Sequence, residues 1–182
     1  EYLFVAGRSD GFRAYDVAGI ANKGVSQRII TAPFGPLGHN TRIKTKHATC
    51  MALPTNQPMA PGRMYKDEET KKFMQEVNQE QPIHAIYSHA FVTDQEEGLI
   101  VVNVDTLSDG EARNNFFERA LTWNPNGVLS GARHITLAGS TAYIAGDFGV
   151  AIIGLENPLQ PKLLNLLPFN GARATAVQFR YL

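Results

Sequence analysis

One apolar hairpin pattern occurs three times in the chain, and this repetition constrains the fold more than any single residue. The copies span residues 3–17, 90–104 and 142–155. Each copy has an apolar segment, a polar turn that closes on a glycine, and a second apolar segment, an order that is typical of a β-hairpin. Because a hairpin with two apolar strands cannot shield both of its faces alone, we expect the copies to stack on one another, as in a propeller or a solenoid.

The third copy is flanked by further segments that have the character of strands. Residues 131–139 precede it, with Ile135 and Leu137 at alternating positions, and residues 162–168 follow it after a proline-containing segment. Four consecutive antiparallel strands in roughly forty residues make one propeller blade. The predicted fold class is therefore mainly β, a β-propeller-like array of about three four-stranded antiparallel blades.

The hairpins are unequally spaced, which predicts two insertions, at about residues 55–80 and at about 108–130. In the first insertion, residues 67–77 have acidic side chains in the first turn and apolar side chains at helical spacing. This pattern predicts a short inserted amphipathic helix. Residues 25–31 are predicted to be the fourth strand of the first blade, and residues 47–53 an inner strand of the blade that follows.

The repeat also bears on how the array closes. The tripeptide Gly-Ala-Arg at residues 131–133 recurs at 171–173, and in that register Tyr181 takes the position that Tyr2 has in the first copy. Two interpretations stay open: the C-terminal strand pairs with an N-terminal hairpin to complete a shared blade, or residues 1–182 are a propeller fragment of a longer array. Closed propellers have about four to eight blades, so we expect one chain to remain a partial ring that another chain completes, as in a homo-oligomer.

Composition and charge exclude several classes of protein. Seventeen Lys and Arg residues balance seventeen Asp and Glu residues, so no overall positive field favours nucleic acid. The longest apolar stretches are only as long as a strand, and we therefore expect no membrane insertion. The single cysteine excludes an intrachain disulfide and any multi-cysteine zinc or haem-attachment motif.

The aligned hairpins resemble the LVIVD-repeat family of β-propellers. The resemblance lies in the glycine-initiated second strands at residues 11–17, 98–104 and 149–155, and in the proline-containing exit at 157–161. It implies a bacterial or archaeal surface or secreted protein, and hence an extracytoplasmic location. Some members of the family are found beside multihaem cytochromes, which implies such a cytochrome as a candidate partner.

His47 and Cys50 are the most closely spaced pair of metal-ligating side chains. Residues three apart on a strand point to opposite faces, so this pair could bind a metal only where the strand bends. We favour a buried Cys50 and a His47 that caps the end of a strand. Accordingly, we expect neither a metal nor a cofactor.

The second insertion holds the residues that we regard as candidates for partner binding, Phe116, Phe117 and Trp123. Aromatic residues of these types are enriched at the hot spots of interfaces. An equal alternative is that they pack beneath their own loop as a small apolar cluster.

The sequence contains neither a Gly-x-Ser-x-Gly nucleophile elbow nor a glycine-rich phosphate-binding loop. The expected function is a non-catalytic scaffold or binding module outside the cytoplasm, whose partner is another protein, a multihaem cytochrome or a second copy of the chain. Two alternatives stay open: an accessory subunit of a multihaem electron-transfer assembly, and an enzyme whose active site lies in a central channel.

Overall fold

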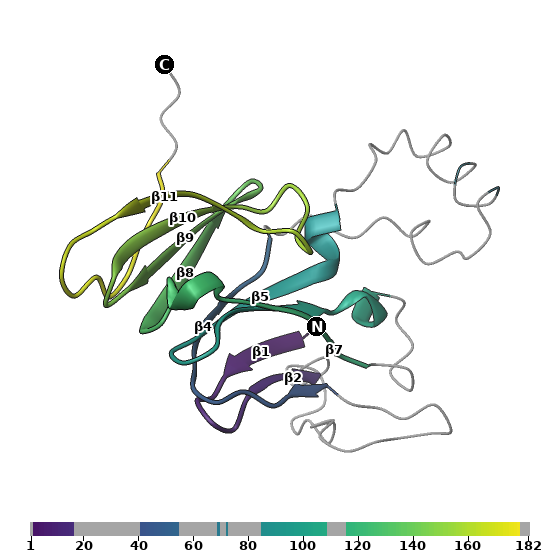
Figure 1. Ribbon diagram of the computed structural model, residues 1–182. Helices are drawn as coiled ribbons and strands as arrows, with labels where there is room; N and C mark the ends of the chain where they lie inside the picture. The colour runs from purple at the N-terminus through teal and green to yellow at the C-terminus, as the bar shows by residue number, and fades with distance from the viewer. Residues whose placement is uncertain are drawn as a thin grey trace.

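The computed structural model describes residues 2–16, 41–54, 69, 72, 85–108 and 116–178. In these residues the strands β1 to β11 form three antiparallel sheets, and the middle sheet lies between the other two (Figure 1). The first sheet contains, in spatial order, β1 (Tyr2–Ala6), β2 (Phe12–Asp16) and β3 (Arg42–Ile43). The middle sheet contains β4 (Ala48–Ala52), β5 (His89–Asp94), β6 (Gly98–Asn103) and β7 (Glu118–Trp123). The third sheet contains β8 (Ala132–Ala138), β9 (Thr141–Gly146), β10 (Gly149–Gly154) and β11 (Lys162–Leu167).

The three predicted hairpins are confirmed as the pairs β1–β2, β5–β6 and β9–β10. Each turn ends on a glycine with a positive φ: 92° at Gly11, 83° at Gly98 and 106° at Gly149. The prediction of a mainly β fold is also confirmed, because the described residues otherwise contain only short 3₁₀ helices and two helical positions. The 3₁₀ helices are η2 (Ala85–Ser88), η3 (Asp105–Ser108) and η5 (Pro125–Gly127).

The predictions for the second insertion, for the strand at 25–31 and for the helix at 67–77 have separate outcomes. Residues 118–123, which we placed inside the second insertion, form β7, the fourth strand of the middle sheet. The strand predicted at 25–31 lies outside the described residues, and β3 is the third strand of the first sheet. Of the helix predicted at 67–77, the described residues are Glu69 and Lys72, and both are helical.

The β5–β6 hairpin of the middle sheet is buried on both faces. Successive side chains of a strand point in opposite directions, and nearly all of those on β5 and β6 are buried. One face of this hairpin packs against the first sheet, and the other packs against the third. Four side chains, each 0% exposed, face the first sheet: Ala90, Val92, Ile100 and Val102. Three side chains, also 0% exposed, face the third sheet: Phe91, Leu99 and Val101. Burial of each large side chain stabilises the fold by about 1.5–3 kcal/mol, so these two interfaces hold the stack together.

Three stacked phenylalanines join the first sheet to the middle sheet. The three ring centroids form a triangle, with distances of 5.9 Å for Phe4–Phe12, 5.5 Å for Phe12–Phe117 and 6.3 Å for Phe4–Phe117. Phe117 comes from the segment just before β7 and is only 2% exposed. Residues more than a hundred positions apart in the sequence therefore share one apolar cluster.

The turn glycines provide a direct test of these hairpins. A Cβ at Gly149 would collide with the carbonyl oxygen of Leu167 and lie 2.8 Å from the amide nitrogen of Phe169, whereas a Cβ at Gly139 would meet no atom within 4 Å. Both glycines have a positive φ, but the 57° at Gly139 is close to the values that Arg8 and Asn126 adopt, whereas the 106° at Gly149 adds backbone strain to the steric collision. We expect Gly139→Ala to lower the free energy of unfolding by about 1 kcal/mol, and Gly149→Ala to lower it by at least about 3 kcal/mol. Urea denaturation measures both, and equal losses would contradict the close packing of β10 against β11 at Gly149.

Candidate functional site

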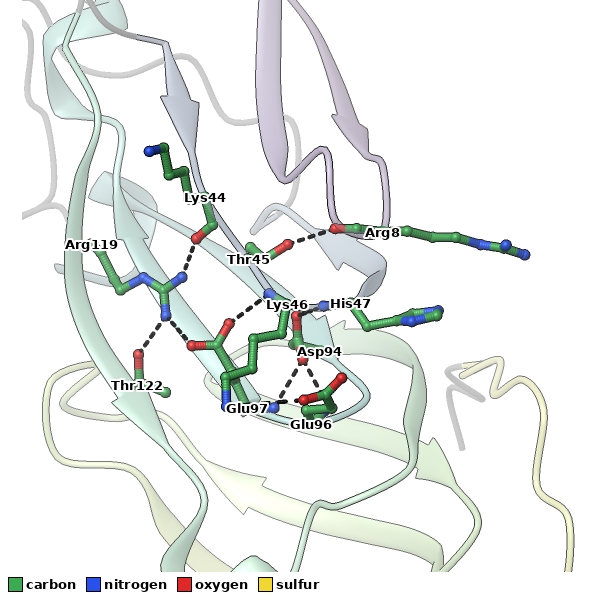
Figure 2. Close-up of polar contacts among 10 residues, drawn as sticks. All are labelled: Arg8, Lys44, Thr45, Lys46, His47, Asp94, Glu96, Glu97, Arg119 and Thr122. Carbon is green, nitrogen blue, oxygen red and sulfur yellow. Dashed lines mark hydrogen bonds and ion pairs between the residues drawn. The ribbon is translucent and has the colours of Figure 1, made fainter.

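A network of polar contacts joins the β5–β6 turn to residues 44–47, which precede β4 (Figure 2). Its centre is Asp94, the last residue of β5, whose side chain is 0% exposed. A buried carboxylate is costly unless hydrogen-bond donors surround it. The donors around Asp94 therefore decide what this carboxylate does.

Both carboxylate oxygens of Asp94 accept backbone hydrogen bonds. Oδ1 accepts from the amides of Glu96 and Glu97 at 2.8 and 2.9 Å, which closes the turn on itself. Oδ2 accepts from the amide of His47 at 2.6 Å. One side chain thus fixes both the shape of the turn and the entry into β4.

Glu97 and Arg119 form a second connection across the same end of the sheet. Oε1 of Glu97 accepts from Nη1 of Arg119 at 2.8 Å, and Oε2 accepts from the amide of Lys46 at 2.9 Å. Nη2 of Arg119 donates to the carbonyl oxygen of Lys44. Arg119 lies on β7, so this ion pair links the turn, the loop before β4 and the outer strand of the sheet.

The same loop also contacts the first sheet. The hydroxyl of Thr45 donates to the carbonyl oxygen of Arg8 at 2.7 Å, and the backbones of Arg8 and Ala48 form two hydrogen bonds of 2.9 and 3.1 Å. Arg8 belongs to the β1–β2 turn, so two hairpin turns hold one connecting loop between them. The third sheet is joined in a similar way, because the amide of Gly131 donates to the carbonyl oxygen of Gln95 at 2.7 Å.

The network supports a structural role for its carboxylates. Every carboxylate oxygen of Asp94 and Glu97 accepts a hydrogen bond from this part of the chain. The exposed pair of Lys46 and Glu96, 3.9 Å apart, adds little stability because solvent screens it. The imidazole of His47 points away from Asp94, as Figure 2 shows. The arrangement therefore acts as a brace between sheets.

The structure keeps His47 and Cys50 in different environments. The strand has a bulge between Ala48 and Cys50, so the segment does bend. Cys50, however, packs against the apolar cluster between the middle and third sheets, and His47 contributes its backbone amide to Asp94. In the described part of the chain, no group of three or more His, Cys, Asp or Glu side chains could hold a metal ion.

The three aromatic candidates for partner binding have different exposures. Phe116 is 45% exposed, while its neighbour Phe117 lies in the phenylalanine stack. Trp123 is partly buried and packs against the cluster between the middle and third sheets. Of the three, Phe116 therefore presents the most accessible ring.

Asp94 was not identified from the sequence as a site residue, and so its buried role was missed. A local signal for Asp94 existed, since an aspartate that begins a tight turn commonly accepts amide hydrogen bonds two and three residues later. Arg119 had no such signal. Its contact with Glu97 depends on the pairing of β6 with β7, which spans about twenty residues.

Comparisons of the chain with protein-family models, with curated proteins and with solved structures found no match. Among the described residues, no helix has both the length and the apolar character needed to cross a membrane.

The role of Asp94 can be tested by stability measurements. Asp94→Ala leaves three partly buried amide donors without their acceptor and should lower the free energy of unfolding by about 3 kcal/mol. Asp94→Asn keeps one carbonyl oxygen for the turn but places an NH₂ group against the amide of His47, so we expect an intermediate loss. Glu96→Gln is the matched control, because the side chain of Glu96 is 60% exposed, and it should change stability by less than about 0.5 kcal/mol. Thermal or urea denaturation in which Asp94→Ala behaves like the control would contradict the brace.

Proposed function

We propose that the chain is a non-catalytic β-propeller module that serves as a scaffold and binds a protein partner. Support for propeller geometry comes from the repeated order of strands and from the packing of each sheet on the next through equivalent faces. In a propeller, loops and outer strands are displayed around a rigid array, and such a surface can bind a partner without any catalytic group.

The observation that carries the proposal is the composition of β11. This strand has the sequence Lys-Leu-Leu-Asn-Leu-Leu and lies at the edge of the third sheet. Leu163 is 41% exposed and Leu164 is 59% exposed. Proteins normally protect edge strands with charges or prolines, and exposed apolar edges are typical of sites that pair with another chain. We infer that a partner covers Leu163 and Leu164.

A second exposed apolar group supports the same function. The backbone of Phe116 is held by Thr106, whose hydroxyl donates to the carbonyl oxygen of Phe116 at 2.8 Å and lies 2.9 Å from its amide nitrogen. The exposed ring thus projects from a fixed backbone. A preorganised aromatic side chain loses little entropy on binding, as interface anchors commonly do.

The proposed setting is the cell surface or an extracellular assembly, as the resemblance to LVIVD-repeat propellers implies. The partner in this proposal is a protein with an apolar contact surface, and a multihaem cytochrome is one candidate of that kind.

Serine substitutions on β11 test the proposal. The purified chain would be immobilised and exposed to extract of the cells that produce it, and the captured protein would be purified for calorimetry. We expect the double variant Leu163→Ser/Leu164→Ser to bind this partner roughly tenfold or more weakly while its circular dichroism stays unchanged, because both side chains are exposed. Phe116→Ala should weaken binding in the same direction.

Leu159→Ser is the matched control, since Leu159 is 48% exposed but lies in the loop between β10 and β11. It should leave the affinity unchanged. Equal affinities of the double variant and the control would refute the binding role of β11, and turnover in a broad hydrolase and oxidase screen would refute the non-catalytic assignment.

A further inference from the structure

Two exposed side chains of β1 occupy positions that are fully buried in the other two hairpins. The turn glycines align the hairpins, and within each hairpin the strand register is regular. The equivalent positions are Leu3, Ala90 and Ala142, and then Val5, Val92 and Ile144. In the middle and third sheets these side chains are 0% exposed, whereas Leu3 is 52% and Val5 is 37% exposed. The outer face of the first sheet therefore resembles a sheet-to-sheet interface that has no neighbour among the described residues.

Among the described residues, the first sheet has three strands and each of the other two has four. The middle and third sheets begin with β4 and β8, which pair with the first strands of their hairpins, β5 and β9. The corresponding hairpin strand in the first sheet is β1. Among the described residues, the sheet has no strand on the side of β1 opposite β2. No strand of the described part of the chain therefore lies beside residues 3–6 on that side.

Residues 172–178 are equivalent in the repeat to β4 and β8, the strands that begin the middle and third sheets, and they pack in a similar way. Ala48, Ala132 and Ala172 are equivalent in the repeat, and they are 1%, 0% and 8% exposed. Each of these alanines shares an apolar cluster with the residue that follows the turn glycine of the preceding sheet. Ala48 shares a cluster with Phe12, Ala132 with Leu99, and Ala172 with Val150.

Thr175 holds this segment against the third sheet. Its amide donates to Nδ1 of His134 at 3.2 Å, and its carbonyl oxygen accepts from the hydroxyl of Thr136 at 2.8 Å. Ile135 of β8 is the residue equivalent to Thr175. It faces the sheet that precedes its own, the middle sheet, as Thr175 faces the third sheet. Residues 172–178 thus lie where the first strand of a following sheet would lie, although they pair with no strand of the described chain.

We propose that residues 172–178 of one copy of the chain pair with β1 of a second copy and complete its first sheet. Within one copy, the segment and β1 lie on opposite sides of the middle sheet (Figure 1), so the pairing joins two copies. Leu3 and Val5 of the second copy then pack on the third sheet of the first, which continues the two interfaces seen within the chain. Two such contacts close a ring of six sheets, within the range of about four to eight that propellers use.

The register of β8 with β9 predicts the new register. His134 lies opposite Ala145, which places Ala174 of one copy opposite Ala6 of the other. The middle sheet has Cys50 opposite Thr93 at this same position, so a cysteine fits there. In a Cys50→Ser background, the variant Ala6→Cys/Ala174→Cys should oxidise to a covalent two-chain species on a non-reducing gel. Ala6→Cys/Ala176→Cys, displaced by one pleat repeat, is the matched control and should cross-link at least about tenfold more slowly, because directly opposite Cβ atoms lie about 5 Å apart and diagonal ones about 7–8 Å.

A second experiment needs no engineered cysteine. The unaltered chain should sediment as a two-chain species, and Leu3→Lys/Val5→Lys should sediment as a single chain with an unchanged circular dichroism spectrum, since both side chains are exposed in the single chain. Leu53→Lys, at a position that is 38% exposed, is the control and should stay paired.

A folded single-chain species of the unaltered protein would overturn the proposal, as would a disulfide within one chain or equal cross-linking of both cysteine pairs. The inference goes beyond the proposed function and does not depend on it. The substitutions at Leu163 and Leu164 should leave the two-chain species intact, so loss of partner binding and loss of self-association are separate results.

Discussion

The architecture depends on the β5–β6 hairpin of the middle sheet, which is apolar on both faces. All residues of β5 and all but the last of β6 are buried, with apolar side chains directed alternately to the two sides. Such a sheet cannot have one face in water, as many antiparallel sheets do, because either exposed face would lose several side-chain burials of about 1.5–3 kcal/mol each. It must be covered twice. The first and third sheets satisfy that requirement, and the stack follows from it.

Apolar packing alone would permit neighbouring sheets to slide, since burial has no direction. The polar contacts at the turns remove this freedom. Asp94 fixes the entry of β4 relative to its own hairpin, and Arg8 fixes the same entry relative to the first sheet. Gln95 then fixes the start of the third sheet. Backbone and carboxylate hydrogen bonds at one end of the array therefore set the spacing that the apolar clusters fill.

The features that could be predicted from the sequence depend on residues close together in the chain, whereas the features that were missed depend on residues far apart in it. The hairpins and their turn glycines were predictable because strand alternation, turn length and positive φ are local properties. The strand β7 was not predicted, since residues 118–123 show no strong apolar alternation and are defined by their pairing with β6. Phe117 and Arg119 depend on that same pairing. Once β7 is placed, one residue enters the phenylalanine stack and the other reaches Glu97.

The outer faces of the first and third sheets also carry apolar side chains, and these are covered to different extents at the two ends of the stack. At the third sheet, residues 172–178 cover Val150 and form polar contacts through Thr175. At the first sheet, the outer face mixes the exposed Leu3 and Val5 with Arg13, which stands where the other hairpins have Ile100 and Ala151. The charge of Arg13 is compensated by Asp10 at 2.7 Å. Apolar groups beside a compensated charge are typical of a surface that is stable in water and still binds a neighbour, whereas the two inner interfaces are as apolar as a domain core.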